Sequence, residues 1–259
     1  MTIENIKKYF LNVIKSGIPF LLLGCTSGKT NMGIPVFIAP AVDITSYIHD
    51  VNHIPKLEEQ IHSLWTNDYN FKVSKYSDKN SSKPEVVNNC KSMLNLYPMG
   101  FRPTYIPDTD IYNYLYAKCK SIDISLNIYP SSNSYVANFK LNTEGVKNLP
   151  KNIAFIPSTS EYKDIHSNEK IKILEEVNHI IKVTQKSNLR VIAEDNSGGI
   201  QDISILAKGD YNHDNIEDIM FKVSNSVIGG SYTSYYLYIL TKTEKDGDWI
   251  VLDEYPKHS

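Results

Sequence analysis

The segment over residues 203–223 most constrains the fold, because a polar loop separates two apolar runs there. The loop reads GDYNHDNIED over residues 209–218, and it follows ISILAK and precedes IMFKV. Both flanking runs have the length and the branched apolar side chains of strands, and Asp, Asn and Gly are typical of the turns between strands. The segment therefore predicts a strand, a short acidic loop and a second strand.

Oxygen-bearing side chains recur through this loop at its first, third, fifth and ninth positions. They are Asp210, Asn212, Asp214 and Asp218. A calcium ion takes about six to eight oxygen ligands, and alternating side chains of a tightly curled loop can converge on one ion. Ile216 would add its backbone carbonyl, and Asn215 stands where a left-handed backbone is needed, which Asn tolerates better than most residues. The alternative is a polar turn that binds no metal.

The loop resembles the calcium loops of FG-GAP and related β-propeller repeat proteins, whose pattern is G-D-x-N-x-D-G-x-x-D followed by an apolar strand. The resemblance covers about residues 203–255, and Asn215 replaces the glycine of the pattern. It implies that the four side chains and the Ile216 carbonyl hold a structural calcium ion, with His213 and Glu217 pointing away from it. Only one copy is present, so a closed propeller of several blades is not expected.

Periodicity along the rest of the chain predicts an α+β fold in one domain over residues 34–259, with a β-rich subregion at 189–255. Helices are expected at 46–65, with a break at Pro55, at 110–124, and from Ser167 or Asn168 to Thr184. Strands are expected at 135–141, 153–156, 189–194, 200–208, 219–223, 235–241 and 249–253, and an extended edge segment at 34–44.

The N-terminus has the order of an export signal. Three lysines precede the apolar run Ile18–Leu23, which is far shorter than the roughly 20 residues that span a bilayer. Leu22 to Cys25 resembles a bacterial lipobox, which implies cleavage after residue 24 and a lipid on Cys25. Residues 25–33 would then be a tether, and the protein would lie in the periplasm, anchored to the outer membrane. The alternative is a buried amphipathic helix followed by an apolar loop.

Three cysteines are awkward for an exported protein unless one has a role other than pairing. Lipidation of Cys25 leaves Cys90 and Cys119 to form a disulfide, and the alternative is a pair of buried, reduced thiols in a cytosolic protein. Neither residue belongs to a C-x-x-C pair or lies beside an evident histidine partner. Metal binding and nucleophilic catalysis by cysteine are therefore not favoured.

Tyrosines gather after Gly229-Gly230, and alternation places Tyr236 and Tyr238 on one face of a strand. An exposed face with Tyr232, Tyr236 and Tyr238 would suit binding to another protein, because rigid aromatic rings bury area at low entropic cost. The alternative is ordinary sheet packing with the hydroxyls at the rim.

The net charge and the lack of recognisable catalytic motifs argue against several classes of function. The formal net charge is -2, so the chain has no strong field for nucleic acid. No nucleophile elbow, phosphate loop, zinc motif or pair of catalytic carboxylates is recognisable. We expect a non-enzymatic periplasmic lipoprotein that binds a protein partner, and its organisation resembles that of lipoproteins that neutralise secreted antibacterial toxins. The alternatives are an envelope hydrolase with a scattered active site and a structural or adhesive envelope component.

Overall fold

The computed structural model describes residues 33–42, 45–47, 56–75 and 84–257, all within the compact unit Gly33–Ser259. The expected signal peptide, Cys25 and all of the expected tether except Gly33 lie outside the described residues, as does the middle of the helix expected at 46–65. None of the described helices is long and apolar enough to cross a membrane.

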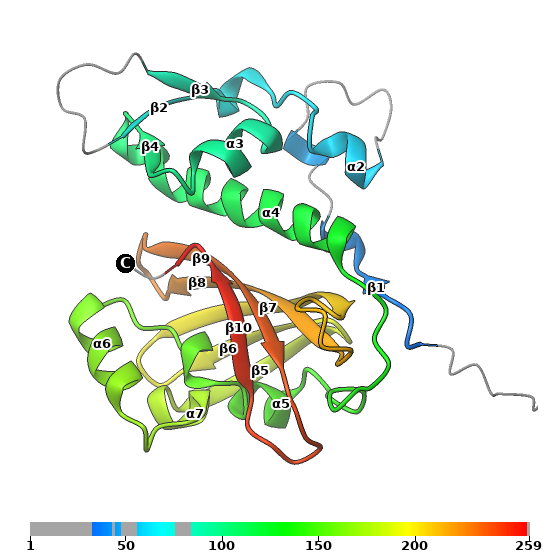
Figure 1. The fold of residues 1–259 in the computed structure, drawn as a ribbon. Helices are drawn as coiled ribbons and strands as arrows, with labels where there is room; N and C mark the ends of the chain where they lie inside the picture. The colour runs from blue at the N-terminus through cyan, green and yellow to red at the C-terminus, as the bar shows by residue number, and fades with distance from the viewer. Residues whose placement is uncertain (1–32, 43–44, 48–55, 76–83, 258–259) are drawn as a thin grey trace, which may run out of the picture. The chain divides into compact units, whose positions relative to one another are not determined.

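A large antiparallel sheet organises the fold (Figure 1). Six of its seven strands follow the order β10-β9-β8-β7-β6-β5. They are β5 (Ile180–Ser187), β6 (Arg190–Asp195), β7 (Gly199–Gly209), β8 (Asp218–Val227), β9 (Thr233–Thr241) and β10 (Ile250–Tyr255). The seventh, β1 (Phe37–Ile38), pairs with Ala207 and Lys208 of β7. These residues follow Ser204, which is the last residue of β7 that pairs with β6.

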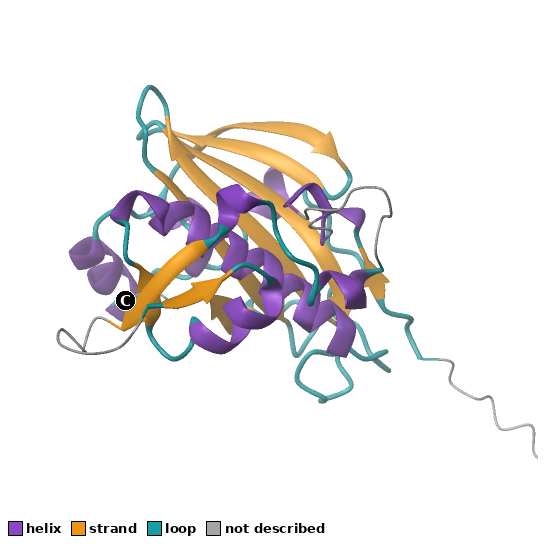
Figure 2. Cartoon of the chain, turned by 90° about the horizontal axis from the view of Figure 1, so that it is seen from above, coloured by secondary structure: helices purple, strands orange, loops and turns teal. Residues whose placement is uncertain are grey.

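One face of the large sheet packs against helix α4 (Thr109–Asn127), which crosses β9. Figure 2 shows the helices on this side from above. Leu115 and Ile122 of α4 share a core with Met220, Leu237 and Ile239 of the sheet. Outside α4 lie α2 (Leu57–Gln60), α3 (Cys90–Leu96) and a small sheet of β3 (Glu85–Val87), β2 (Phe71–Lys75) and β4 (Phe101–Pro103).

The opposite face packs against the chain between α4 and β5. Its regular elements are α5 (Thr143–Lys147), a 3₁₀ turn at Lys151–Ile153, α6 (Thr159–Ser167) and α7 (Leu174–Val177). Val146 and Leu174 from this layer share a second core with Ile203, Phe221 and Leu240 of the sheet. Both faces of the central strands are therefore buried, and the fold is α+β as predicted.

Three elements predicted for the central part of the chain are wrong. The helix expected from Ser167 or Asn168 to Thr184 is instead a loop, the short α7 and strand β5, and the segments 135–141 and 153–156 form no strands. Apolar residues in this region do recur every three or four positions, but β5 satisfies its backbone by pairing with β6, from Ile180↔Asp195 to Ser187↔Arg190. Sheet pairing decides the conformation here over the local helical pattern.

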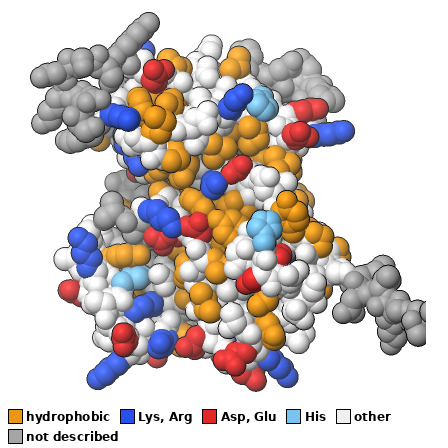
Figure 3. Space-filling view, viewed as in Figure 1, with side chains coloured by type: hydrophobic (Ala, Val, Ile, Leu, Met, Phe, Trp, Pro, Cys, Tyr) orange, Lys and Arg blue, Asp and Glu red, His pale blue; other side chains and the backbone are white. Residues whose placement is uncertain are grey.

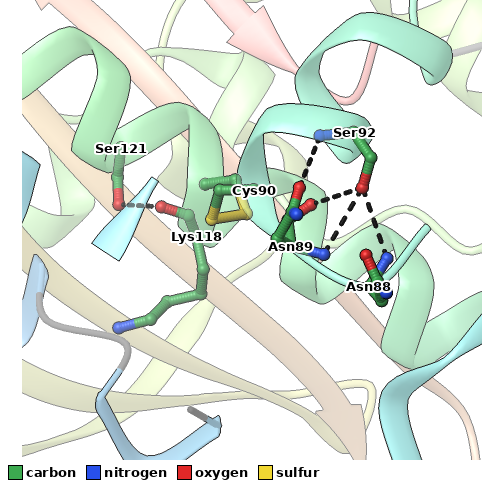
Figure 4. Close-up of a disulfide and its surroundings, with 7 residues drawn as sticks. Asn88, Asn89, Cys90, Ser92, Lys118 and Ser121 are labelled. Atoms are coloured by element: carbon green, nitrogen blue, oxygen red, sulfur yellow. Dashed lines mark hydrogen bonds between the residues drawn. A yellow bond between two sulfur atoms is a disulfide. The ribbon is translucent and has the colours of Figure 1, made fainter. Parts of the chain in front are cut away.

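A disulfide between Cys90 and Cys119 fastens α3 to α4, and the expected pairing is therefore present (Figure 4). Both cysteines are fully buried, and their Cα atoms are 5.1 Å apart. Asn89 caps α3 by accepting a hydrogen bond from the Ser92 amide at 2.8 Å, while the Ser92 hydroxyl donates to the Asn89 carbonyl at 2.9 Å. The cap and the bridge together fix the first turn of this short helix.

Removal of the disulfide should destabilise the protein substantially. The bridge spans a sequence separation of 29 residues, and loop-closure entropy for that length corresponds to about 3 to 4 kcal/mol. We expect a Cys90→Ala, Cys119→Ala variant to lose that much unfolding free energy in urea titrations. Reductant during unfolding should lower the wild-type midpoint to that of the variant and leave the variant unchanged. Equal midpoints for the two proteins without reductant would contradict this expectation.

Candidate functional site

The acidic loop joins β7 to β8 and is held by its own side chains. The Asp210 carboxylate accepts hydrogen bonds from the amides of Asp214 at 3.1 Å and Asn215 at 2.8 Å. Asp214 in turn accepts the Ile216 amide at 2.8 Å. Asn215 has the left-handed backbone predicted for it, with a φ of 66°, and His213 has the same φ. The loop is thus curled tightly around Asp210.

A segment directly after α4 supports the loop from outside, and no local pattern in the sequence indicates this contact. Tyr129 exchanges two backbone hydrogen bonds with Asp210, at 3.0 and 2.7 Å. The carbonyl of Asn215 accepts the amides of residues 132 and 133 at 3.0 Å each. Glu217 is buried and accepts a hydrogen bond from the Ser134 hydroxyl at 2.6 Å. Glu217 therefore has a structural contact of its own.

Asp218 is the most unusual side chain of the loop. It is only 1% exposed; Oδ2 accepts the Tyr211 amide at 2.8 Å, whereas Oδ1 has no hydrogen-bond donor among the described residues. The buried Thr241 hydroxyl lies close enough to lower the pKa of Asp218, but it does not complete a hydrogen bond. Burial, with further repulsion from Asp214 and Asp210, raises the pKa of Asp218 to about 6.

The five expected calcium ligands lie on one curled loop, but their positions differ in exposure. Asp210 and Asp218 are buried, Asn212 and Asp214 are exposed, and Ile216 is intermediate. Within the described ranges, no three acidic, histidine or cysteine side chains are gathered into a group that could hold a metal ion. The donor set nevertheless has the chemistry of a calcium site, since a cation beside the unpartnered Oδ1 of Asp218 would offset both its burial and the repulsion.

The three tyrosines expected on a binding surface separate in the structure. Tyr238 is 2% exposed and packs in the second core, so it cannot form part of an exposed face. Tyr236 lies on the same side of β9 as predicted, 5.9 Å from Tyr238 between ring centroids, but is only half-buried. Tyr232 is 43% exposed and stands before the start of β9. Tyr232 and Tyr236 are therefore accessible for binding, whereas Tyr238 is not part of an exposed face.

Tyr232 and Tyr236 line a groove made of three adjoining hollows of about 290, 150 and 500 Å³. The first and second hollows share Asn113, Tyr232, Tyr236 and Pro256, and the second and third share Asp110, Thr233 and Tyr235. We call the three together the tyrosine groove. Its lining includes residues of the first turns of α4, of the β8–β9 turn and Pro256 after β10, and Figure 1 locates these elements in the fold.

Charge differs along the tyrosine groove. The first hollow has Arg102 and Lys257 in its wall, whereas the third has Asp110, Asp202 and Lys222. Burial lowers the pKa of Lys222, although neighbouring Asp202 acts in the opposite direction. Figure 3 shows hydrophobic side chains gathered on one face where the α4 layer meets the large sheet. No motif in the sequence links Arg102 or Asp110 to the tyrosines, so local pattern does not predict that they share a groove.

A chain of hydrogen bonds connects the acidic loop to this groove. Tyr211 donates its amide to Asp218 and its hydroxyl to Asp253 at 2.9 Å. Asp253 also accepts hydrogen bonds from Tyr255 and Lys257. Burial alone would raise the pKa of Asp253, but the hydrogen bonds outweigh it and hold the pKa below its usual value. The position of Lys257 at the groove thus depends on an anchor shared with the loop.

Comparison of the chain with protein-family models, with curated protein sequences and with solved structures finds no match.

The raised pKa of Asp218 predicts how stability depends on pH when a chelator is present. The folded-state pKa of about 6 lies above the ordinary value of 3.8, so the folded state binds the proton more tightly and is stabilised as the pH falls through 6. Linkage gives a gain of about 1 kcal/mol between pH 7 and pH 5.

We expect urea titrations to show this gain in unfolding free energy for wild type, relative to Asp218→Asn. Asn carries no titrating proton, and all other titrating groups are common to the two proteins. Parallel stability curves between pH 7 and pH 5 would contradict the assignment.

Proposed function

We propose that this protein acts by binding another protein, and that a segment of the partner lies in the tyrosine groove. The observation that carries this proposal is the continuity of the three hollows, with Tyr97, Tyr162, Tyr232, Tyr235 and Tyr236 in their walls. A groove of this kind offers a row of rigid aromatic rings with polar hydroxyl ends, which is the chemistry that dominates protein interfaces.

Exposed apolar side chains beside the groove support a partner of protein size. Tyr105 and Ile106 are 64% and 81% exposed and precede Thr109, which lines the first hollow. Ile228 is 63% exposed and lies in the β8–β9 turn with Tyr232. A partner that filled the groove could cover these side chains as well, and so remove further apolar area from water.

Calcium is proposed as a structural ion of the acidic loop, held by the side chains of Asp210, Asn212, Asp214 and Asp218 and the carbonyl of Ile216. Its chemistry there is neutralisation of the charges of the three aspartates that the loop carries. Tyr211 contacts both Asp218 and Asp253, so a loop fixed by the ion would also hold the wall of the groove in place.

Calcium should therefore raise the thermal midpoint. For an ion at about 100 times its dissociation constant, mass action contributes about 2.7 kcal/mol, or about 5 to 10 °C for a domain of this size. We expect an Asp210→Ala, Asp214→Ala variant to lose this response in calorimetry. Asp246→Asn, Asp248→Asn, which changes an exposed acidic pair in the β9–β10 turn, should retain it. A wild-type midpoint that is the same in calcium and in chelator would remove the ion from the proposal.

The setting in which the protein acts is proposed from its N-terminal sequence. Export, a lipid on Cys25 and attachment to the outer membrane would place the groove in the periplasm, where incoming toxins act. A secreted antibacterial toxin is accordingly the class of partner to test first, beginning with the products of neighbouring genes.

The role of the groove can be tested with a purified partner. The tagged full chain would recover candidates from envelope extracts of its source, and each candidate would then be purified and titrated by calorimetry. We expect Tyr232→Ala to weaken the complex by about tenfold or more, as for a central interface tyrosine. Tyr135→Ala is a matched control, because Tyr135 is 38% exposed and lies outside the groove lining. Equal effects of the two substitutions would refute binding in the groove.

A further inference from the structure

The first hollow of the tyrosine groove has two basic side chains in its wall. We call it the Arg102 hollow; its volume is about 290 Å³, and its lining includes Tyr97, Arg102, Tyr162, Tyr232, Tyr236 and Lys257. None of the described residues in this lining is acidic. Glu254 is near enough to raise the pKa of both Tyr162 and Tyr236, after the larger effect of burial, but it is not part of the lining. The wall therefore holds two cations, of which Lys257 is paired with Asp253 behind the lining and Arg102 has no acidic partner among the described residues.

Arg102 is held in a fixed orientation. Its Nη1 donates to the carbonyls of Tyr97 at 2.9 Å and Phe101 at 2.8 Å. The guanidinium carbon lies 3.8 Å from the centroid of the Tyr97 ring, and that ring is stacked on Tyr116 with centroids 3.7 Å apart. Arg102 thus rests on an aromatic stack whose other members belong to the core, and little side-chain entropy remains to be lost when it binds a ligand.

Part of the Arg102 donor set is unused. Across the described residues, no acidic side chain forms an ion pair with Arg102, and its Nε and Nη2 atoms donate no hydrogen bond to the protein. Burial of a cation is costly unless it is paired, and Arg102 is half-buried. Nε and Nη2 are two donors in the planar geometry that a carboxylate accepts in bidentate fashion.

Lys257 adds a second positive charge to the same hollow. It is anchored to Asp253, and its side chain is 68% exposed, so its ammonium group keeps donors directed to solvent. A ligand group with negative charge would thus meet one rigid, oriented cation and one flexible cation. An uncharged polar group would meet the same donors without the Coulombic attraction.

From this geometry we infer that the Arg102 hollow binds a carboxylate, supplied by an aspartate or glutamate side chain of the protein partner. The inference rests on the proposed function and adds the chemistry of the contact: an acidic residue of the partner enters the hollow, pairs with Arg102 through two hydrogen bonds and packs its stem against Tyr232 and Tyr236. The third hollow, whose wall carries Asp110, Lys222 and an Asp202 that is paired with Arg190, would take another part of the partner segment.

The inference can be tested before any partner is known. The probes are the blocked tripeptide acetyl-Ala-Glu-Ala-amide, its glutamine counterpart and inorganic phosphate, each titrated into the isotope-labelled full chain and followed by NMR. We expect the glutamate peptide to shift signals of residues 97, 102, 232 and 257, and to bind at least five times more tightly than the glutamine peptide. Equal binding of the two peptides, or phosphate binding at least ten times more tightly than the glutamate peptide, would overturn the inference.

Variants assign the contact to its residues. Arg102→Gln should weaken the glutamate peptide at least tenfold, Arg102→Lys should weaken it less, and Lys91→Gln, which changes an exposed cation of α3, should leave it unchanged. Thermal midpoints would report whether Arg102→Gln still folds, since Arg102 also bonds two carbonyls. Lys257→Gln is the second variant, with an expected loss of at least threefold. Wild-type affinity in both Gln variants at positions 102 and 257 would overturn the inference.

Failure of this inference differs from failure of the proposed function. If the glutamate peptide does not bind but Tyr232→Ala still weakens a purified partner, the carboxylate site is wrong and the groove stands. If the peptide binds at the Arg102 hollow while Tyr232→Ala leaves the partner unaffected, the site is an anion site and the partner binds elsewhere.

Discussion

Burial of both faces of β7, β8 and β9 is the constraint on which the other features depend. Ile203, Phe221 and Leu240 face the layer made by residues 131–180, whereas Met220 and Leu237 face α4. A one-residue slip in any of these strands would exchange the two sets and expose the wrong side chains to each layer. The register is therefore fixed along the full strands, and the two connections at their ends, the acidic loop and the β8–β9 turn, are fixed with it.

The tyrosine groove forms where the layers meet at one end of the sheet. Its wall combines residues from the segment before α4, the first turns of α4, the start of α6, the β8–β9 turn and the C-terminal end of β10. The disulfide holds α3 against α4, and Tyr97 from the end of α3 carries Arg102 on its ring. A rigid wall of this kind suits recognition, because few side chains need to be ordered when a partner binds.

The acidic loop lies in the same structural unit as the groove and is connected to it through the sheet. Tyr211 occupies the second position of the loop, yet its hydroxyl reaches Asp253 of β10, which also anchors Lys257. One tyrosine and one aspartate thus connect Asp218 to a residue of the groove wall. In the proposed function, the ion of the loop stabilises the surface that the partner contacts, and the chemistry of recognition belongs to the groove.

Local sequence determined the elements whose signals are contained within a few residues. These are the five C-terminal strands, helix α4, the left-handed Asn215 and the face alternation of Tyr236 and Tyr238, since turn chemistry and side-chain period act locally. Tertiary structure decided the features that depend on distant residues. Residues 180–187 form strand β5 because they pair with β6, and Tyr238 is buried because a second layer covers its face of the sheet. Arg102 lines a hollow with tyrosines that lie more than 100 residues away in the sequence. Such contacts cannot be predicted from spacing in the sequence, because the packing of layers against one another brings these residues together.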